Sequence, residues 1–161
     1  TSQVFMPFGD SAQYFLAPGG DAESSRWKTA GGASIVSGKG VLGLGSSVYA
    51  LPDGGSITSG SFCLGYDSPT LRYSINDPGV AGAVLQVEVI WTSPSGKVYT
   101  VPIGWIKSGA AGVRLASPNF LLANLAGLLT ETGTTSVQLR FTGTGATWQV
   151  DDIYVDPFKR V

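Results

Sequence analysis

Two pairs of carboxylates near opposite ends of the chain are the residues best suited to chemistry. Asp21 and Glu23 lie in the segment PGGDAE, and Asp151 and Asp152 adjoin one another in WQVDDIYV. Aspartate is uncommon in strands, and a buried carboxylate is costly unless another group pairs with it. If the first and last strands are neighbours, these side chains and some turn carbonyls converge into the hard oxygen donors that Ca²⁺ prefers. We therefore expect a structural calcium ion, which would add to the free energy of unfolding.

The same acids have a second interpretation that needs no metal. Neighbouring side chains in a strand point to opposite faces, so at most one of Asp151 and Asp152 faces the core side. Asp21 and Glu23 are two apart and point the same way if their segment is extended. Asp151 would then lie on a solvated face, and Asp152 would accept hydrogen bonds from backbone or hydroxyl groups at a sheet end.

The elements that must position these residues are strands. Of the 161 residues, 43% are hydrophobic and only 13% charged, with 23 Gly and 9 Pro, which is typical of an all-β protein with many tight turns. Apolar and polar residues alternate over 83–92 and 136–141, and SPSG at 93–96 predicts a hairpin over 84–106. The further predicted strands are 12–17, 26–37, 47–52, 56–66, 70–76, 112–117 and 147–155.

The chain is long enough for one domain with a substantial core, and turn signals punctuate the strands at short intervals. We predict a single domain over 1–161, an antiparallel sandwich or barrel, with 1–11 as an N-terminal arm or edge strand. One segment differs, because Leu121, Leu125 and Leu129 fit the helical period. It predicts a short helix near 119–129, capped by Asn119.

Both ends of the chain resemble a known family. The segments LAPGGDAESSRW (16–27) and WQVDDIYVD (148–156) are similar to the galactose-binding-like jelly-roll, the fold of many carbohydrate-binding modules attached to secreted glycoside hydrolases. The opening FMPFGDSAQYFLAPGGDAE (5–23) also resembles a group of secreted actinobacterial proteins of unassigned function. The resemblance implies an all-β, antiparallel two-sheet β-sandwich (jelly-roll) and a secreted, extracellular protein.

The resemblance also bears on the acids. In that fold the first and last strands are close, and many members carry a structural calcium there. Its acidic ligands would fall on Asp21, Glu23 and either Asp151 or Asp152. The residue between the first two is usually Phe, and here it is Ala22.

Composition argues against several classes of function. There is no histidine, so the commonest general base and metal ligand is missing, and Cys63 has no activating partner. No second pair of carboxylates faces the first across a cleft, as glycosidase chemistry requires. The ten cations are scattered, which argues against nucleic acid, and no apolar run reaches the length of a membrane span. We expect no catalysis, no nucleic-acid partner and no membrane span.

Recognition of a polysaccharide or other glycan would need exposed aromatic rings beside polar groups. The candidates are Tyr73 with Arg72, Tyr99, Trp105 and Tyr49. The competing interpretation is that most aromatic side chains in a sandwich of this size belong to its core. The preferred prediction is a non-catalytic, carbohydrate-binding-like recognition module.

The low charge favours an alternative, a self-assembling extracellular subunit of a surface layer or fibre. The apolar opening TSQVFMPFG could add to the edge of a neighbouring sheet, or it could cover its own sandwich. Cys63 is either a small buried hydrophobe or an odd cysteine whose partner lies upstream of Thr1 or in another subunit. The start at Thr1 suggests a mature or trimmed product.

Overall fold

The strand pattern expected from the sequence is present in the computed structural model, which describes residues 1–23 and 26–157. The elements are, in chain order, η1 (Met6–Phe8), β1 (Phe15–Leu16), β2 (Lys28–Ala30), β3 (Ser34–Ser37), β4 (Ser47–Leu51), β5 (Ser56–Thr58), β6 (Phe62–Gly65), β7 (Thr70–Asp77), β8 (Val84–Thr92), β9 (Val98–Lys107), β10 (Gly112–Leu115), β11 (Asn119–Phe120), η2 (Ala123–Leu129), β12 (Thr134–Thr144) and β13 (Trp148–Asp156). The all-β prediction is confirmed.

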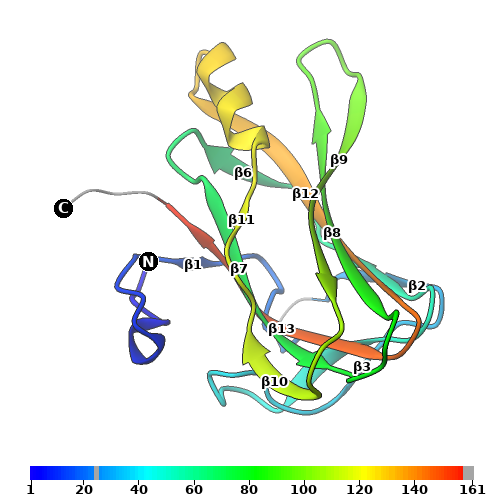
Figure 1. Cartoon of the computed structure of the whole chain (residues 1–161). Coiled ribbons are helices and arrows are strands. Elements are labelled where there is room, and N and C mark those ends of the chain that lie inside the picture. Colours follow the sequence, from blue (N-terminus) through cyan, green and yellow to red (C-terminus); the bar gives the residue numbers. More distant parts are fainter. Residues whose placement is uncertain (24–25, 158–161) are drawn as a thin grey trace.

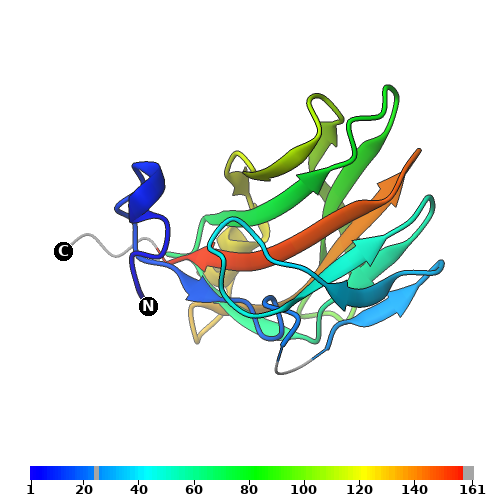
Figure 2. The ribbon, with the colours of Figure 1, turned by 90° about the horizontal axis from the view of Figure 1, so that it is seen from below.

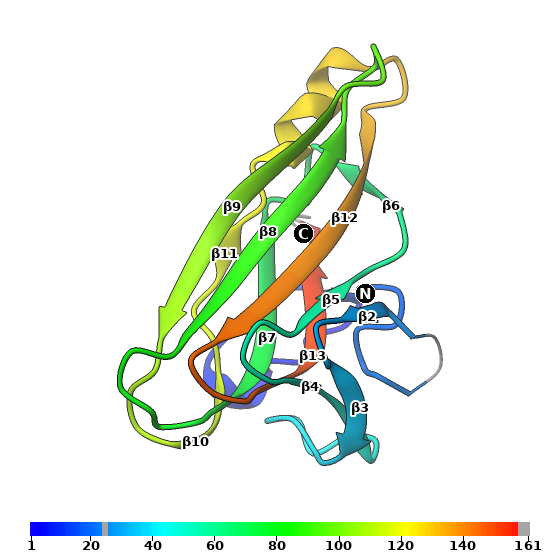
Figure 3. The ribbon, with the colours of Figure 1, turned by 90° about the vertical axis from the view of Figure 1, so that its right-hand side faces the viewer.

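Two antiparallel sheets face one another (Figure 1). Sheet I has the order β10-β7-β13-β4-β3, with β1 added beside β13 and β11 beside β7. Sheet II has the order β2-β5-β12-β8-β9, with β6 added beside β12. Figure 3 looks onto sheet II, and Figure 2 shows the long strand β13 crossing sheet I. The predicted two-sheet sandwich is therefore confirmed, and β9 and β10 are edge strands joined by a short loop.

Alternation along the long strands fills the space between the sheets. On β8, the side chains of Leu85, Val87 and Val89 are fully buried, while the intervening residues are partly exposed. Trp148 from sheet I and Phe141 from sheet II are among the largest buried side chains. Burial of apolar surface at about 25 cal/mol per Å² makes this layer the main source of stability.

Two predicted elements have different boundaries. The strand expected over 26–37 is divided into β2 and β3, which belong to different sheets. The chain crosses between the sheets at Gly31 and Gly32, which have φ values of 62° and 85°. A Cβ at Gly31 would lie 2.2 Å from the carbonyl oxygen of Gly54, so only glycine fits this crossing.

The predicted helix is shorter than expected and is a 3₁₀ helix. Asn119 pairs with Leu71 in β11 and so does not cap a helix. Instead η2 starts after Leu122, whose φ of 60° turns the chain and whose side chain makes no capping hydrogen bond.

The N-terminal arm covers its own sandwich. Phe5 is fully buried, and its ring makes edge contacts with Tyr14 at 5.0 Å and Tyr154 at 5.4 Å between centroids. Ser2 forms a bridge with Tyr14 that holds the start of the arm. The arm thus packs against its own domain and does not extend toward a neighbouring sheet.

Within the described ranges, no helix has both the length and the apolar character needed to cross a lipid bilayer.

Candidate functional site

The first and last strands of the chain are neighbours, as the family resemblance implied. Phe15 of β1 pairs with Val155 of β13, and the amide of Ala17 donates to the carbonyl of Ile153 over 2.9 Å. The amide of Ile153 in turn donates to the carbonyl of Gly20 over 3.0 Å. The turn that carries Asp21 therefore lies directly beside the strand that carries Asp151 and Asp152.

Both aspartates of β13 are buried on the same side, which corrects the expectation that they point to opposite faces. Asp152 has a φ of 50°, and the register with β7 shifts between Asp151 and Tyr154. Alternation fails because of this left-handed residue, and both carboxylates turn toward the loop over 38–46. The amide of Gly40 donates to Oδ2 of Asp151 over 3.0 Å, and the amide of Leu42 donates to Oδ2 of Asp152 over 3.3 Å.

Burial and mutual repulsion disfavour the ionised forms of these two carboxylates. Burial raises the pKa of Asp151 to about 7, and the neighbouring charge of Asp152 adds to the increase. The pKa of Asp152 is raised as well, mainly by burial and further by the charge of Asp21. Oδ1 of Asp151 is buried without a hydrogen-bond partner in the part of the chain that the structure describes. A bound cation would relieve all three penalties.

The four-acid ligand set expected from the sequence is not assembled. The segment around Asp21 is a turn with Ala22 at a φ of 57°, so its side chains do not follow strand alternation. Glu23 instead accepts hydrogen bonds of 2.6 Å from the amides of both Ser46 and Ser47. These bonds are the main reason that the pKa of Glu23 is lowered.

The donor set fits a cation in part. Over residues 1–23 and 26–157, no three carboxylates or thiols come together as a metal-binding group. The buried pair Asp151 and Asp152 still supplies hard oxygen donors, including the unpartnered Oδ1. The residues present therefore supply part of the oxygen donor set that Ca²⁺ uses, with the charge of Asp21 close enough to raise the pKa of both aspartates.

Two of the five aromatic and basic candidates for sugar contact belong to the core, which corrects their assignment. The side chains of Tyr49 and Tyr73 have no exposed surface. The hydroxyl of Tyr49 donates to the carbonyl of Gly19, and that of Tyr73 donates to Oδ1 of Asn119. Rings that are covered on both faces cannot stack on a sugar.

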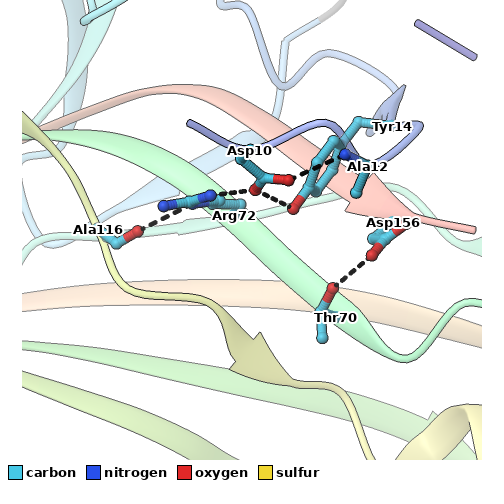
Figure 4. A network of polar contacts seen from close by, with 7 residues as sticks. All are labelled: Asp10, Ala12, Tyr14, Thr70, Arg72, Ala116 and Asp156. Atoms are coloured by element: carbon cyan, nitrogen blue, oxygen red, sulfur yellow. Dashed lines mark hydrogen bonds and ion pairs between the residues drawn. The ribbon is translucent and has the colours of Figure 1, made fainter. Parts of the chain in front are cut away.

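Arg72 is engaged by the N-terminal arm (Figure 4). Its Nη1 donates to the carboxylate of Asp10, which also accepts from the hydroxyl of Tyr14 over 2.7 Å. The guanidinium carbon lies 5.7 Å from the centre of the Phe5 ring. Arg72 thus fastens the arm to β7, and the prediction that it contacts a glycan is replaced by this structural role.

Tyr99 is partly exposed, but its ring is occupied. It stacks on Trp91 with 5.1 Å between ring centroids and 21° between planes. The ammonium of Lys97 lies 4.9 Å from the Tyr99 centroid. The ring therefore has no face free for a sugar unless Lys97 moves away.

Trp105 is the most exposed of the five sequence candidates. It is 60% exposed, and it lines a cavity of about 330 Å³ at the edge of the sandwich where β9 and β10 meet. Ile75 and Ile106 contribute apolar lining, and Asn119 contributes an amide. The cavity is completed by Lys107, Arg114, Leu115, Ala116 and Ser117.

Polar side chains continue from Trp105 across the outer face of sheet II. Trp105 pairs with Gln86 of β8, and Gln86 pairs with Thr142 of β12. In the adjoining row, Nε of Arg140 lies 3.0 Å from Oε1 of Glu88. An exposed ring beside a row of amide and hydroxyl groups is the arrangement that sugar recognition uses.

Asp77 organises the loop from β9 to β10, next to the cavity. Its buried carboxylate accepts from the amides of Gly79 and Gly109 at 2.9 and 3.0 Å and from the hydroxyl of Ser108. Nη2 of Arg114 lies 3.1 Å from Oδ2 of Asp77. The loop from β9 to β10 and the guanidinium are thereby held in one arrangement.

Sequence reasoning missed Asp77, Lys107, Arg114 and Asn119. A partial signal was available, because Lys107 directly follows one predicted strand and Arg114 lies early in the next. These residues lie close together because β9 and β10 are the edge strands of the two sheets on the same side of the sandwich. The order of strands within a sheet cannot be predicted from the pattern of apolar and polar residues.

Cys63 is exposed on β6 and makes no disulfide with a described residue. The expectation of a small buried hydrophobe is therefore wrong, and pairing with an upstream residue or another subunit stays a prediction.

Comparison with known proteins places the fold. A scan against protein-family models found no match, and neither did a search of curated proteins. Among solved structures, the chain is similar to the CBM22-1 xylan-binding domain from Paenibacillus barcinonensis Xyn10C, with a TM-score of 0.55 and 12% identity over 92% of this chain and 95% of that one.

Two longer structures match as well. The tandem CBM22-1–CBM22-2 domains of the same Paenibacillus barcinonensis protein give a TM-score of 0.63 with 10% identity, over 93% of this chain and 47% of that one. The CBM22-1 and GH10 modules of the Clostridium thermocellum endo-1,4-β-D-xylanase 10B, complexed with xylohexaose, give 0.58 with 12% identity, over 83% of this chain and 26% of that one. At these identities the likeness shows the fold alone: the chain has the jelly-roll β-sandwich fold of carbohydrate-binding modules.

Proposed function

We propose that the chain is a non-catalytic extracellular module that recognises carbohydrate at the cavity beside Trp105. The observation that carries the proposal is that Trp105, which is 60% exposed, is one of the residues that line that cavity. The apolar face of a sugar ring packs on such a ring, and hydroxyl groups pair with amides and hydroxyls of the kind that Asn119 and Ser117 supply. The fold shared with carbohydrate-binding modules supports the class of function and the extracellular location.

The chemistry of the cavity supports recognition without catalysis. Glycoside hydrolysis uses two carboxylates that face each other across the scissile bond. None of the described residues that line the cavity is acidic. The buried pair Asp151 and Asp152 lies beneath the loop over 38–46.

The test is retention on polysaccharides. Affinity gel electrophoresis and pull-down on insoluble polysaccharides, started from a glycan array, should show binding by the wild-type protein. Trp105→Ala should weaken it at least about 10-fold, since aromatic contacts contribute on the order of 1–2 kcal/mol. Tyr66→Ala is the matched control, because Tyr66 is a similarly exposed ring, at 58%, outside the cavity. Equal binding by Trp105→Ala, or no retention on any polysaccharide, contradicts the proposal.

A second candidate function, self-assembly, is favoured by one specific observation. Exposed apolar side chains gather around η2 on neighbouring elements, and we call them the η2 apolar cluster: Tyr66, Phe120, Leu122, Leu125 and Leu129. Clusters of this kind are often covered by a partner. Light scattering after size exclusion should then show oligomers that Leu125→Lys dissociates and Leu44→Lys, at another exposed leucine, leaves intact. A monomer at every concentration excludes this candidate.

We also propose a structural calcium ion at the Asp151–Asp152 pair. Its support is the unpartnered buried oxygen and the mutual repulsion described above. When bound, the ion would supply positive charge that compensates the two carboxylates, and its role would be stability rather than contact with sugar.

A further inference from the structure

The cavity beside Trp105 is lined by two positively charged side chains as well as by apolar ones. Lys107 and Arg114 line it from β9 and β10, and no described acidic residue does. Lys107 and Arg114, together with the Asp77 that pairs with Arg114, sum to a formal charge of +1, whereas the whole chain has −1, so the local charge is opposite in sign to the overall one. This positive charge is local and does not reflect a basic protein as a whole. It would attract a negatively charged group of a ligand to the cavity.

The two cations are prepared to bind an anion. Lys107 forms no ion pair with any other described residue, so its ammonium keeps all its donors. Arg114 directs Nη1 and Nη2 at one oxygen of Asp77, while 44% of its side chain stays exposed. A guanidinium has five N–H donors in a fixed plane, so further donors remain for a second carboxylate.

Asp77 also links the two segments that carry the cations. It accepts from Ser108 and Gly109, which directly follow Lys107, and it pairs with Arg114. One buried carboxylate thus fixes both sides of the loop that carries them. Arg114, which is held in place by Asp77, therefore loses little conformational entropy when a ligand binds.

From these observations we propose that the glycan recognised at the Trp105 cavity carries carboxylates, as a polysaccharide of uronic acids does. This inference rests on the proposed function and adds the class of sugar. Trp105 would pack on the apolar face of a sugar ring, while Lys107 and Arg114 pair with the carboxylate of that ring or its neighbour. The planar carboxylate matches the planar guanidinium better than a neutral hydroxymethyl group does.

The test compares a uronic acid polymer with its uncharged methyl ester, and adds three further polymers as controls. The probes are polygalacturonate and its fully methyl-esterified form, with alginate as a second uronate polymer, neutral xylan as an uncharged polymer and dextran sulfate as a non-carboxylate anion. We expect the wild-type protein to bind polygalacturonate at least about 10-fold more tightly than the methyl ester, because a carboxylate accepts stronger, charge-assisted hydrogen bonds from Lys107 and Arg114 than an ester does. Binding should weaken as salt is added.

The variants distinguish binding at the cavity from nonspecific electrostatic attraction between the protein and an anionic polymer. Lys107→Gln should lose about 10-fold in affinity for polygalacturonate, and the matched control Lys97→Gln should not, because Lys97 lies outside the cavity. Arg114→Lys keeps the charge but removes the planar fork, so an intermediate loss is expected. Thermal denaturation of each variant checks that it is folded.

Each other outcome overturns the inference in a distinguishable way. Retention by neutral xylan, or equal retention by the methyl ester, that depends on Trp105 refutes the carboxylate and leaves the proposed function intact. Equal binding of dextran sulfate, or equal losses in Lys107→Gln and Lys97→Gln, shows nonspecific charge attraction. Retention on none of the polymers refutes both the inference and the proposed function.

Discussion

The guanidinium of Arg114 lies 3.1 Å from the carboxylate of Asp77, whose side chain is completely buried between the edge of sheet I and the loop from β9 to β10. Burial alone would raise the pKa of Asp77. Hydrogen bonds from Ser108 and two loop amides, together with the charge of Arg114, outweigh burial and lower that pKa below 3.8. The ionised form is therefore the one that stabilises the folded state.

The first prediction concerns this carboxylate. Asp77→Ala should reduce the free energy of unfolding by about 2 kcal/mol at pH 7, because several loop donors lose a charged acceptor. Because the folded pKa lies below the unfolded one, the stabilisation is fully present above about pH 4. It is lost as the pH falls through the folded pKa. Urea denaturation from pH 8 to pH 2 should show the gap between variant and wild type closing only at the acid end.

The control for that series is Glu131→Gln, an exposed acid with no hydrogen bond to a described residue. It should change stability by less than about 0.5 kcal/mol at every pH. A gap for Asp77→Ala that persists unchanged to pH 2 would mean that packing, rather than the charge, makes the contribution.

The second prediction concerns calcium. EDTA should lower the melting temperature of the wild-type protein, and added Ca²⁺ should restore it, because a ligand that binds only the folded state stabilises that state. Asp151→Asn should abolish this response. In EDTA the variant should melt at or above the wild-type temperature, since it removes repulsion from Asp152 and gives the unpartnered position of Oδ1 a neutral group.

Asp53→Asn serves as the control, because Asp53 lies in an exposed turn at another part of the molecule. Its response to Ca²⁺ should equal that of the wild type. Identical melting curves of the wild-type protein in EDTA and in millimolar Ca²⁺ would rule the ion out.

The third prediction concerns the N-terminal arm. Phe5→Ala should cost about 3 kcal/mol, because the ring is fully buried between Tyr14 and Tyr154. Phe8→Ala, at a ring 43% exposed on the same arm, should cost less than about 1 kcal/mol. Guanidinium denaturation measures both, and equal costs would show that the arm does not dock through Phe5.

The fourth prediction concerns the close approach of a loop to the buried aspartates. A Cβ at Gly40 would lie 2.3 Å from Oδ2 of Asp152 and 2.8 Å from Oδ2 of Asp151. Gly40→Ala should therefore lose about 1–3 kcal/mol through steric overlap. Gly60→Ala, where nothing lies within 4 Å of the added Cβ, should be nearly neutral in the same thermal denaturation.

Much of the fold could be predicted from the sequence, because its signals are local. Alternation over 83–92 and 136–141 and the turn at 93–96 predict elements that the structure contains. The adjacency of the chain ends followed from the family resemblance and is present in the pairing of Phe15 with Val155. The division of 26–37 between two sheets was missed, because it depends on where Gly31 meets the distant Gly54.

The site was less predictable, because its features are not local. The left-handed φ of Asp152 overrides strand alternation, and the residue type alone gives only a weak preference for it. Whether an aromatic ring is buried depends on which face of its strand the side chain points to, and on whether the opposite sheet covers that face. Tyr73 and Trp105 both lie in predicted strands, yet one lies in the core and the other beside a cavity.

The positions of β12 and β13 in the sheets have a consequence for the speed of folding. β12 pairs with β5 and β6 on one side and β8 on the other, and β13 lies between β7 and β4. Each of these two strands comes later in the chain than every strand it pairs with, and each is the central strand of its layer. Both layers therefore close through contacts between segments distant in sequence, which form slowly.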